Sequence, residues 1–304
     1  MSTTLTDLST ALAAAVAHAA RSTVAVDARP RLPSTGVHWR DGLVVTTDAT
    51  VKRPHDMRVL LPDGRSVPAT LAGRDPATDL AALRIEPGLL PVADVAPAAS
   101  LAPGHLVLAL ARTGDEGARV AFGAVSSTGS AWRTWRGGTL DRRVQSDLTL
   151  HPGFGGGPLV TAEGRIAGIN SGGLSKPLAV TIPDTTIDRV LDALVEGGGR
   201  VSRAWLGASL QLVRFSESAR ERLGIEGRGG LVVIDTEPDS PAMQAGMLIG
   251  DVLVRIAGTR TETHEDVLVA IARQSVGSTV PATVVRGGAL TDVTLTLGER
   301  PRGR

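Results

Sequence analysis

Short runs of β-forming residues, separated by turn signals, fill the chain from Thr23 to about residue 170 and constrain its fold more than any other feature. Turn sequences such as Pro62-Asp63-Gly64 stand between the runs, and proline and glycine at such places favour reversal of the chain. The pattern predicts an all-β barrel or sandwich. The predicted strands are Thr23–Val26, Gly42–Thr46, Met57–Leu61, Leu106–Ala109, Ala118–Val125 and Arg165–Ile169.

A change of character after residue 196 indicates a second domain. Thr185–Val195 carries apolar residues at helical spacing, and the glycine-rich stretch Glu196–Arg200 follows it as a linker. Beyond the linker we expect a smaller mixed unit, because helical and strand patterns alternate there. Its predicted strands are Gly230–Asp235, Val252–Ile256, Val280–Val285 and Thr291–Leu297, and its predicted helices are Pro241–Ala245 and Glu265–Gln274.

Composition excludes several function classes. The 304 residues carry a net charge of +1 and no cysteine, so disulfides, thiolate zinc sites and cysteine nucleophiles are absent. No block of basic residues suggests binding to nucleic acid or to an anionic membrane. No apolar run is long enough to span a membrane. We expect no cofactor and no metal.

The amino-terminal segment is alanine-rich, and it reads as a helix rather than a signal peptide. Leu5, Leu8, Leu12 and Val16 recur at helical spacing, no Lys or Arg precedes Arg21, and Asp7 stands where a signal peptide carries positive charge. We expect an amphipathic helix packed on the first domain. This interpretation predicts a cytoplasmic location, with the periplasm as the alternative.

Three segments of the first domain carry specific motifs. The first segment is a long acidic and glycine-containing pattern over Asp63–Arg65 and Ala72–Ala81. The second, Gly42–Val51, is typical of a strand and a turn, and the third is a glycine-rich loop at Gln145–Val160. Together they resemble the HtrA family, in which a trypsin-like protease domain precedes one or more PDZ domains. The resemblance implies a mainly β fold, with a trypsin-like double β-barrel at 1–197 followed by a small α+β PDZ domain at 203–300.

The resemblance also assigns roles to particular residues. Asp79 matches the catalytic aspartate, but Ala49 stands at the position of the catalytic histidine and Gly155 at that of the serine. Phe154 replaces a usual asparagine. Serine-protease chemistry needs a nucleophilic oxygen, a base beside it and a carboxylate that orients the base. Only the carboxylate remains, while the backbone N–H groups of Gly153 and Gly155 are a remnant of the oxyanion hole.

Four other residues near these loops are candidate substitutes for the base or the nucleophile. His151 and His55 are the nearest histidines in sequence, and we interpret both as surface or loop residues. Ser146 and Ser171 are hydroxyls in the same segments, but neither lies in the glycine-rich turn. Asp79 itself has an alternative role, since it can simply hydrogen-bond backbone groups left from the ancestral site.

The second domain carries a strong PDZ-like pattern over Leu231–Val233 and Asp239–Leu253. Arg203–Ala208 resembles the loop that captures the terminal carboxylate of a peptide through backbone N–H groups, and Ser209–Val213 would offer an open strand edge. Trp205 has an alternative role in packing the second domain against the first. The predicted peptide-binding residues are Trp205, Leu206, Gly207 and Ala208.

The predicted helix Glu265–Gln274 would form the other wall of the groove. The sequence leaves open which of Val267, Leu268 and Ile271 faces the core and which faces a peptide. His264, at the start of the helix, is either a surface residue or a donor to a ligand hydroxyl.

The leading hypothesis is a proteolytically inactive HtrA-like pseudoprotease that binds peptide carboxyl termini or unfolded segments as adaptor, regulator or holdase. The alternative is an HtrA-family serine endopeptidase with displaced or partner-completed catalytic residues. A third possibility is a non-catalytic subunit, in a homotrimer or in a hetero-oligomer with an active homologue. No nucleic acid is expected among the partners.

Overall fold

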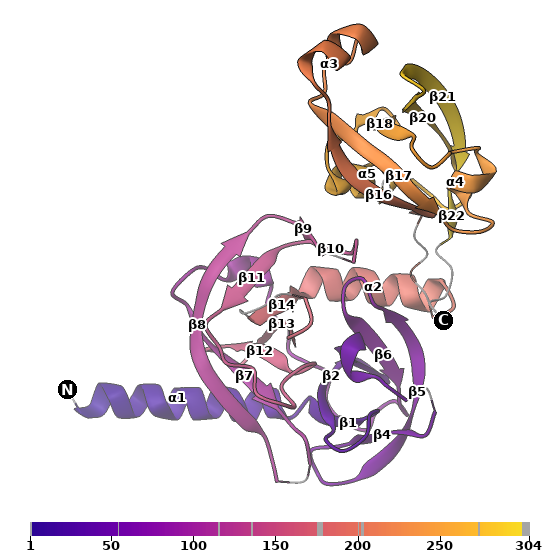
Figure 1. Cartoon of the computed structure of the whole chain (residues 1–304). Coiled ribbons are helices and arrows are strands. Elements are labelled where there is room, and N and C mark those ends of the chain that lie inside the picture. The colour runs from indigo at the N-terminus through magenta and orange to yellow at the C-terminus, as the bar shows by residue number, and fades with distance from the viewer. Residues whose placement is uncertain are drawn as a thin grey trace. The chain divides into compact units, whose positions relative to one another are not determined.

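The computed structural model describes residues 2–53, 55–114, 116–134, 136–174, 179–199, 201, 204–272 and 274–299. The chain forms two compact units, Met1–Val201 and Ser202–Arg304. The first unit holds two closed barrels and the helices α1 and α2, and the second a smaller sheet with short helices (Figure 1).

The first barrel closes in the strand order β1-β2-β3-β6-β5-β4, and all its neighbouring strands are antiparallel. Alternate residues of each strand point inward, and valines such as Val24, Val44 and Val59 fill the interior. Its strands are β1 (Thr23–Asp27), β2 (Ser34–Arg40), β3 (Leu43–Thr47), β4 (Met57–Leu60), β5 (Ser66–Asp75) and β6 (Leu80–Arg84), and the 3-10 helix η1 (Asp48–Thr50) follows β3.

The second barrel closes in the order β11-β14-β13-β12-β7-β8. Its interior contains Val107, Val144, Leu159 and Phe154. The hairpin of β9 (Trp132–Arg133) and β10 (Thr139–Leu140) lies outside this path, and the 3-10 helix η2 (Ala98–Ser100) precedes β7. The barrel strands are β7 (Leu106–Ala111), β8 (Arg119–Gly129), β11 (Arg143–Ser146), β12 (Pro158–Thr161), β13 (Ile166–Ser171) and β14 (Ala179–Pro183).

Two helices flank the barrels. In α2 (Asp184–Glu196) the predicted apolar face is buried, and Asp188 accepts a hydrogen bond from Trp39 Nε1 at 2.9 Å. The amino-terminal helix α1 (Ser2–Ala20) only partly meets its prediction. Its second half packs on the core through Leu12 and Val16, whereas Leu5 and Leu8 are exposed because the first half runs beyond the barrel (Figure 1).

The second unit is built on the strand order β16-β17-β18-β20-β21, with β16 at one end and β19 paired to β18. Its strands are β15 (Ala204–Trp205), β16 (Ala208–Arg214), β17 (Gly229–Thr236), β18 (Val252–Ile256), β19 (Thr259–Arg260), β20 (Thr279–Arg286), β21 (Ala289–Thr296) and β22 (Gly298–Glu299). Its helices are α3 (Glu217–Leu223), α4 (Pro241–Gln244) and α5 (His264–Ala272).

The mainly β prediction, with a double barrel followed by a small α+β unit, is confirmed. The sequence pattern missed several barrel strands, among them β2 and β5, and the helix α3. Helix α5 ends at Ala272, two residues before Gln274, the predicted boundary. Within the described ranges, no helix is long and apolar enough to cross a membrane.

Candidate functional site

Asp79 lies at the end of the turn between β5 and β6 and is almost completely buried. Its φ of 57° is a left-handed conformation that aspartate tolerates better than most side chains. Its carboxylate accepts two hydrogen bonds, to Oδ1 from the Ala49 N–H at 2.8 Å and to Oδ2 from the Ser171 hydroxyl at 2.6 Å. Ala49 belongs to the first barrel and Ser171 to the second, so Asp79 joins the two barrels at one point.

No cation pairs directly with this carboxylate among the described residues. Burial raises the pKa of Asp79 above its ordinary value, the hydrogen bonds from Ser171 and Ala49 oppose that rise, and the nearby charge of Asp48 adds to it. The carboxylate of Asp48 is itself paired with Arg74, which holds the 3-10 turn that presents Ala49. The 3-10 turn is therefore fixed. The methyl side chain of Ala49 is partly exposed and cannot exchange a proton with a substrate.

Gly155 is partly exposed and faces the same 3-10 turn. A Cβ built on it would lie 3.6 Å from Thr50 Cγ2 and 3.7 Å from Thr47 Oγ1, which are ordinary contacts. Its φ lies outside the left-handed region, so a serine could occupy this position without strain. The two threonine hydroxyls are buried, and Thr50 Oγ1 donates to the Thr47 carbonyl at 2.8 Å. In the described part of the chain, the hydrogen bonds of these two hydroxyls stay within Thr46, Thr47 and Thr50, so they hold the turn.

The glycine-rich loop retains two unused backbone donors. No hydrogen bond in the described part of the chain takes the N–H of Gly153 or Gly155 as donor, although Gly156 N–H donates to the Asn170 carbonyl at 3.0 Å. Gly153 has φ of 99°, and a Cβ there would lie 2.3 Å from Thr113 Cγ2. Glycine is required at this place, and it leaves two N–H groups available to an oxygen atom.

Phe154 anchors this loop. Its side chain is buried in the interior of the second barrel, and its ring makes an edge contact with His151 at 6.1 Å between centroids. The guanidinium carbon of Arg119 lies 5.9 Å from the ring centroid, a cation–π distance. Phe154 therefore fixes the loop to the interior of the second barrel through apolar and cation–π contacts.

The remaining candidates for nucleophile or base do not complete the site. His151 and His55 are exposed. Ser146 is buried, and its hydroxyl has no partner among the described residues. Ser171 is buried and donates to Asp79, a role that the sequence pattern missed because the two residues stand 92 positions apart.

In the second unit, the loop between β15 and β16 also leaves backbone donors free. The N–H groups of Leu206 and Gly207 donate to nothing in the described residues, whereas both carbonyls accept hydrogen bonds, from Ala242 and Glu237 at 2.9 Å each. Gly207 has φ of 74°, and its Cα lies against Ser240 and the ring of Trp205. The loop is thus held through its two carbonyls, while its two N–H groups have no acceptor among the described residues.

Helix α5 and strand β16 lie beside this loop. Val267 and Ile271 are buried in the core of the unit, whereas Leu268 is partly exposed. Ala208 and Leu210 of β16 are half-buried against the same core. The half-buried Trp205 packs on Gly207 and Gly298 within its own unit. Leu268 of α5 and Ala208 and Leu210 of β16 are therefore partly exposed apolar side chains of these two elements.

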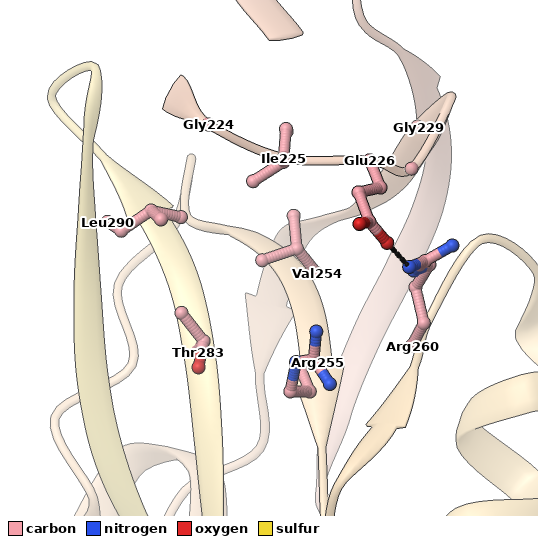
Figure 2. Close-up of a pocket in the computed structure, with 10 residues that line it drawn as sticks. Gly224, Ile225, Glu226, Gly229, Val254, Arg255, Arg260, Thr283 and Leu290 are labelled. Carbon is pink, nitrogen blue, oxygen red and sulfur yellow. Dashed lines mark hydrogen bonds and ion pairs between the residues drawn. The ribbon is translucent and has the colours of Figure 1, made fainter. Parts of the chain in front are cut away.

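A separate cavity of about 280 Å³ lies elsewhere in the second unit, and none of its walls comes from α5, β15 or β16. Figure 2 shows Ile225, Val254 and Leu290 around it, with the ion pair between Glu226 and Arg260 at 2.5 Å on one side. This cavity is independent of the two amide-bearing loops.

Two family models match the chain. One is the trypsin-like peptidase domain, over residues 34–169, and the other is the PDZ domain, over residues 206–297. Among solved structures, the HtrA-type protease AlgW with decapeptide has a TM-score of 0.76 at 28% identity and covers 96% of this chain and 99% of its own. The serine endoprotease from Yersinia pestis has a TM-score of 0.75 at 27% identity, covering 94% and 97%.

Curated relatives carry the same family resemblance. A probable periplasmic serine endoprotease DegP-like from Marinomonas sp. (strain MWYL1) is 32% identical over 278 residues, which cover 90% of this chain and 58% of the relative. Its counterpart from Halomonas elongata is 31% identical and covers 90% and 57%. The chain thus spans a little over half the length of these relatives.

The predicted cytoplasmic location is contradicted by these relatives, whose names place them in the periplasm. The prediction is based on the amino-terminal segment, which we interpret as a helix of the folded domain. Such a helix does not indicate the compartment in which the protein is located. The matched domains, their order and the paired barrels agree with one another, and the chain belongs to the HtrA family of trypsin-like proteases with PDZ domains.

Proposed function

We propose that this chain is a non-cleaving HtrA protein that works by binding peptides through its PDZ domain. The observation that carries the proposal is the contact of Asp79 with the backbone N–H of Ala49. The carboxylate that orients the base in a serine protease is in place, but the side chain at 49 is a methyl and position 155 has no side chain. Positions 49 and 155 therefore supply neither a base for proton transfer nor an oxygen for nucleophilic attack.

The PDZ loop supports the binding half of the proposal. Two free amides beside an apolar strand and helix suit the carboxylate and last side chain of an extended peptide, which would add to the edge of β16. A short peptide of this kind would bind with a Kd of about 1 μM. Such affinity suits an adaptor, a regulator or a holdase for unfolded segments, and the names of the relatives favour the periplasm as its site of action.

The direct test is hydrolysis of a fluorogenic unfolded protein by the purified chain, together with labelling by a fluorophosphonate probe. We expect neither cleavage nor labelling. Cleavage that persists after repeated purification, or labelling of any serine, would contradict the proposal. An active relative from the same family, assayed in parallel, shows that the substrate and the probe work.

A serine endopeptidase is the second candidate, because the relatives are named serine endoproteases and the Gly153 and Gly155 amides are free to hold an oxyanion. In that case the missing groups come from a displaced residue or from a partner subunit. Size-exclusion chromatography with light scattering, of the chain alone and mixed with an active homologue, tests this. A mixed oligomer that cleaves an unfolded substrate faster than the homologue alone at the same concentration would favour it.

A further inference from the structure

Helix α5 and strand β16 share a contact that the proposed peptide binding does not require. His264, the first residue of α5, places its Nε2 2.8 Å from the carbonyl oxygen of Leu210 in β16. Because a carbonyl only accepts hydrogen bonds, Nε2 carries the proton. The side chain of His264 is otherwise exposed.

The start of α5 holds His264 in this place. Thr263 Oγ1 accepts from the Asp266 N–H at 3.2 Å, and Asp266 Oδ2 accepts from the Thr263 N–H at 2.7 Å. This reciprocal pair is a capping box, which fixes the first turn of a helix. The imidazole therefore projects from a rigid position toward β16.

The carbonyl of Leu210 belongs to the open edge of the sheet. Leu210 pairs with Val233, and the polar groups of Val233 point the other way, since its N–H donates to Asp251 at 2.8 Å and its carbonyl accepts from Gly250 at 2.9 Å. In an antiparallel pair, residues directly opposite turn their polar groups together, either toward or away from each other. Leu210 thus turns its N–H and carbonyl outward, and β16 is the terminal strand of its sheet.

We propose that His264 is a latch on the PDZ groove, which occupies the Leu210 carbonyl until an extended peptide with a free carboxyl terminus displaces it. This inference rests on the proposed peptide binding. A peptide added to β16 bonds to the outward groups of that strand. Leu210 lies two residues after Ala208 and follows the free amides of Leu206 and Gly207. The backbone N–H of an incoming strand would replace the imidazole N–H at the same oxygen.

The latch lowers peptide affinity, because one hydrogen bond must be broken before another forms. A neutral hydrogen bond at an exposed site has a modest net value, so its removal corresponds to about a 2- to 10-fold gain in affinity. Removal of the latch should appear as faster association of the peptide, because the His264–Leu210 hydrogen bond must break before the peptide can pair with β16.

The test is fluorescence-polarisation titration of the whole chain with fluorescein-labelled decapeptides that have four random carboxyl-terminal residues and a free carboxylate. Wild type is compared with His264→Ala and with Glu265→Ala, a matched change of an exposed side chain in the same helical turn. Circular dichroism checks that each variant folds. ¹⁵N-edited NMR of the ligand-free chain follows the exchange of the His264 Nε2–H.

We expect His264→Ala to bind the pool about 2- to 10-fold more tightly, Glu265→Ala to match wild type, and the Nε2–H to be protected until peptide is added. Equal or weaker binding by His264→Ala overturns the latch and leaves peptide binding standing. Fast exchange of Nε2–H in the ligand-free chain also overturns it. If neither wild type nor His264→Ala binds the pool, the proposed peptide binding itself fails, and the latch fails with it.

Discussion

The glycine-rich loop of the first unit and the carboxylate loop of the second present the same chemical element, a pair of free backbone N–H groups. Gly153 and Gly155 provide the first pair, and Leu206 and Gly207 the second. Their surroundings differ. In the function we propose, catalysis beside the first pair would need an imidazole and a hydroxyl, which Ala49 and Gly155 do not supply, whereas binding beside the second needs only amides, a strand edge and apolar side chains. Backbone functions survive changes of side chain that abolish side-chain chemistry.

The largest effect is expected from restoring the side chains of the first loop. Ala49→His combined with Gly155→Ser should raise hydrolysis of unfolded casein by at least about 10³-fold over the unmodified chain, since loss of a nucleophile or base costs such sites about 10⁶-fold in kcat. Asp79 is already placed to orient an imidazole, and a Cβ at 155 meets only ordinary contacts. Each single substitution serves as a control and should stay silent. A silent double variant would mean that the barrel no longer holds a protease geometry.

The anchoring of the first loop can be tested by stability. Phe154→Ala removes a buried ring and should lower the free energy of unfolding by about 3–5 kcal/mol in urea denaturation. Phe122→Ala is the matched control, because that ring is 56% exposed in the same barrel, and it should change stability by less than about 0.5 kcal/mol. Equal effects would show that Phe154 does not fix the loop.

The second loop is tested through the charge of its ligand. A decapeptide with an amidated carboxyl terminus should bind about 10- to 100-fold more weakly than its free-acid twin, because hydrogen bonds to a charged group are worth roughly 1.5–3 kcal/mol. Calorimetric titration of the two peptides on the whole chain measures the ratio. Similar affinities would indicate binding that does not use the Leu206 and Gly207 amides.

The smallest effect concerns Asp79. Its pKa is raised in the folded state by burial, so the folded state holds the proton more tightly than the unfolded chain does. Stability is therefore lost as pH rises from the unfolded pKa of about 3.9 through the folded pKa. Asp79→Asn removes this loss, so the variant should be more stable than the wild type at pH 7. Urea denaturation at pH 7 and at pH 4 should show the gain shrinking at the lower pH. A loss of stability at pH 7 would show instead that the carboxylate is favoured by its hydrogen bonds.

Much of the fold follows from local pattern, and the failures have physical causes. The sequence analysis predicts no strand at β2, where Pro33 and Gly36 are residue types common in turns. Gly36 is nevertheless in a strand, since a Cβ there would lie 2.8 Å from side chains of Val26 and Val44, so that only glycine fits inside the barrel. The exposed first half of α1 carries the same apolar spacing as its packed half, so periodicity could not separate them.

Residue identity alone establishes that positions 49 and 155 lack an imidazole and a hydroxyl, because no folding can supply an atom that the chain does not contain. It also establishes that positions 153 and 207 are glycines, which tolerate the positive φ angles found there. The tertiary structure is what brings Ser171 to Asp79 and His264 to Leu210, across 92 and 54 positions. Such contacts depend on how strands pair and helices dock, and hydrogen bonds between distant segments leave no trace in local spacing.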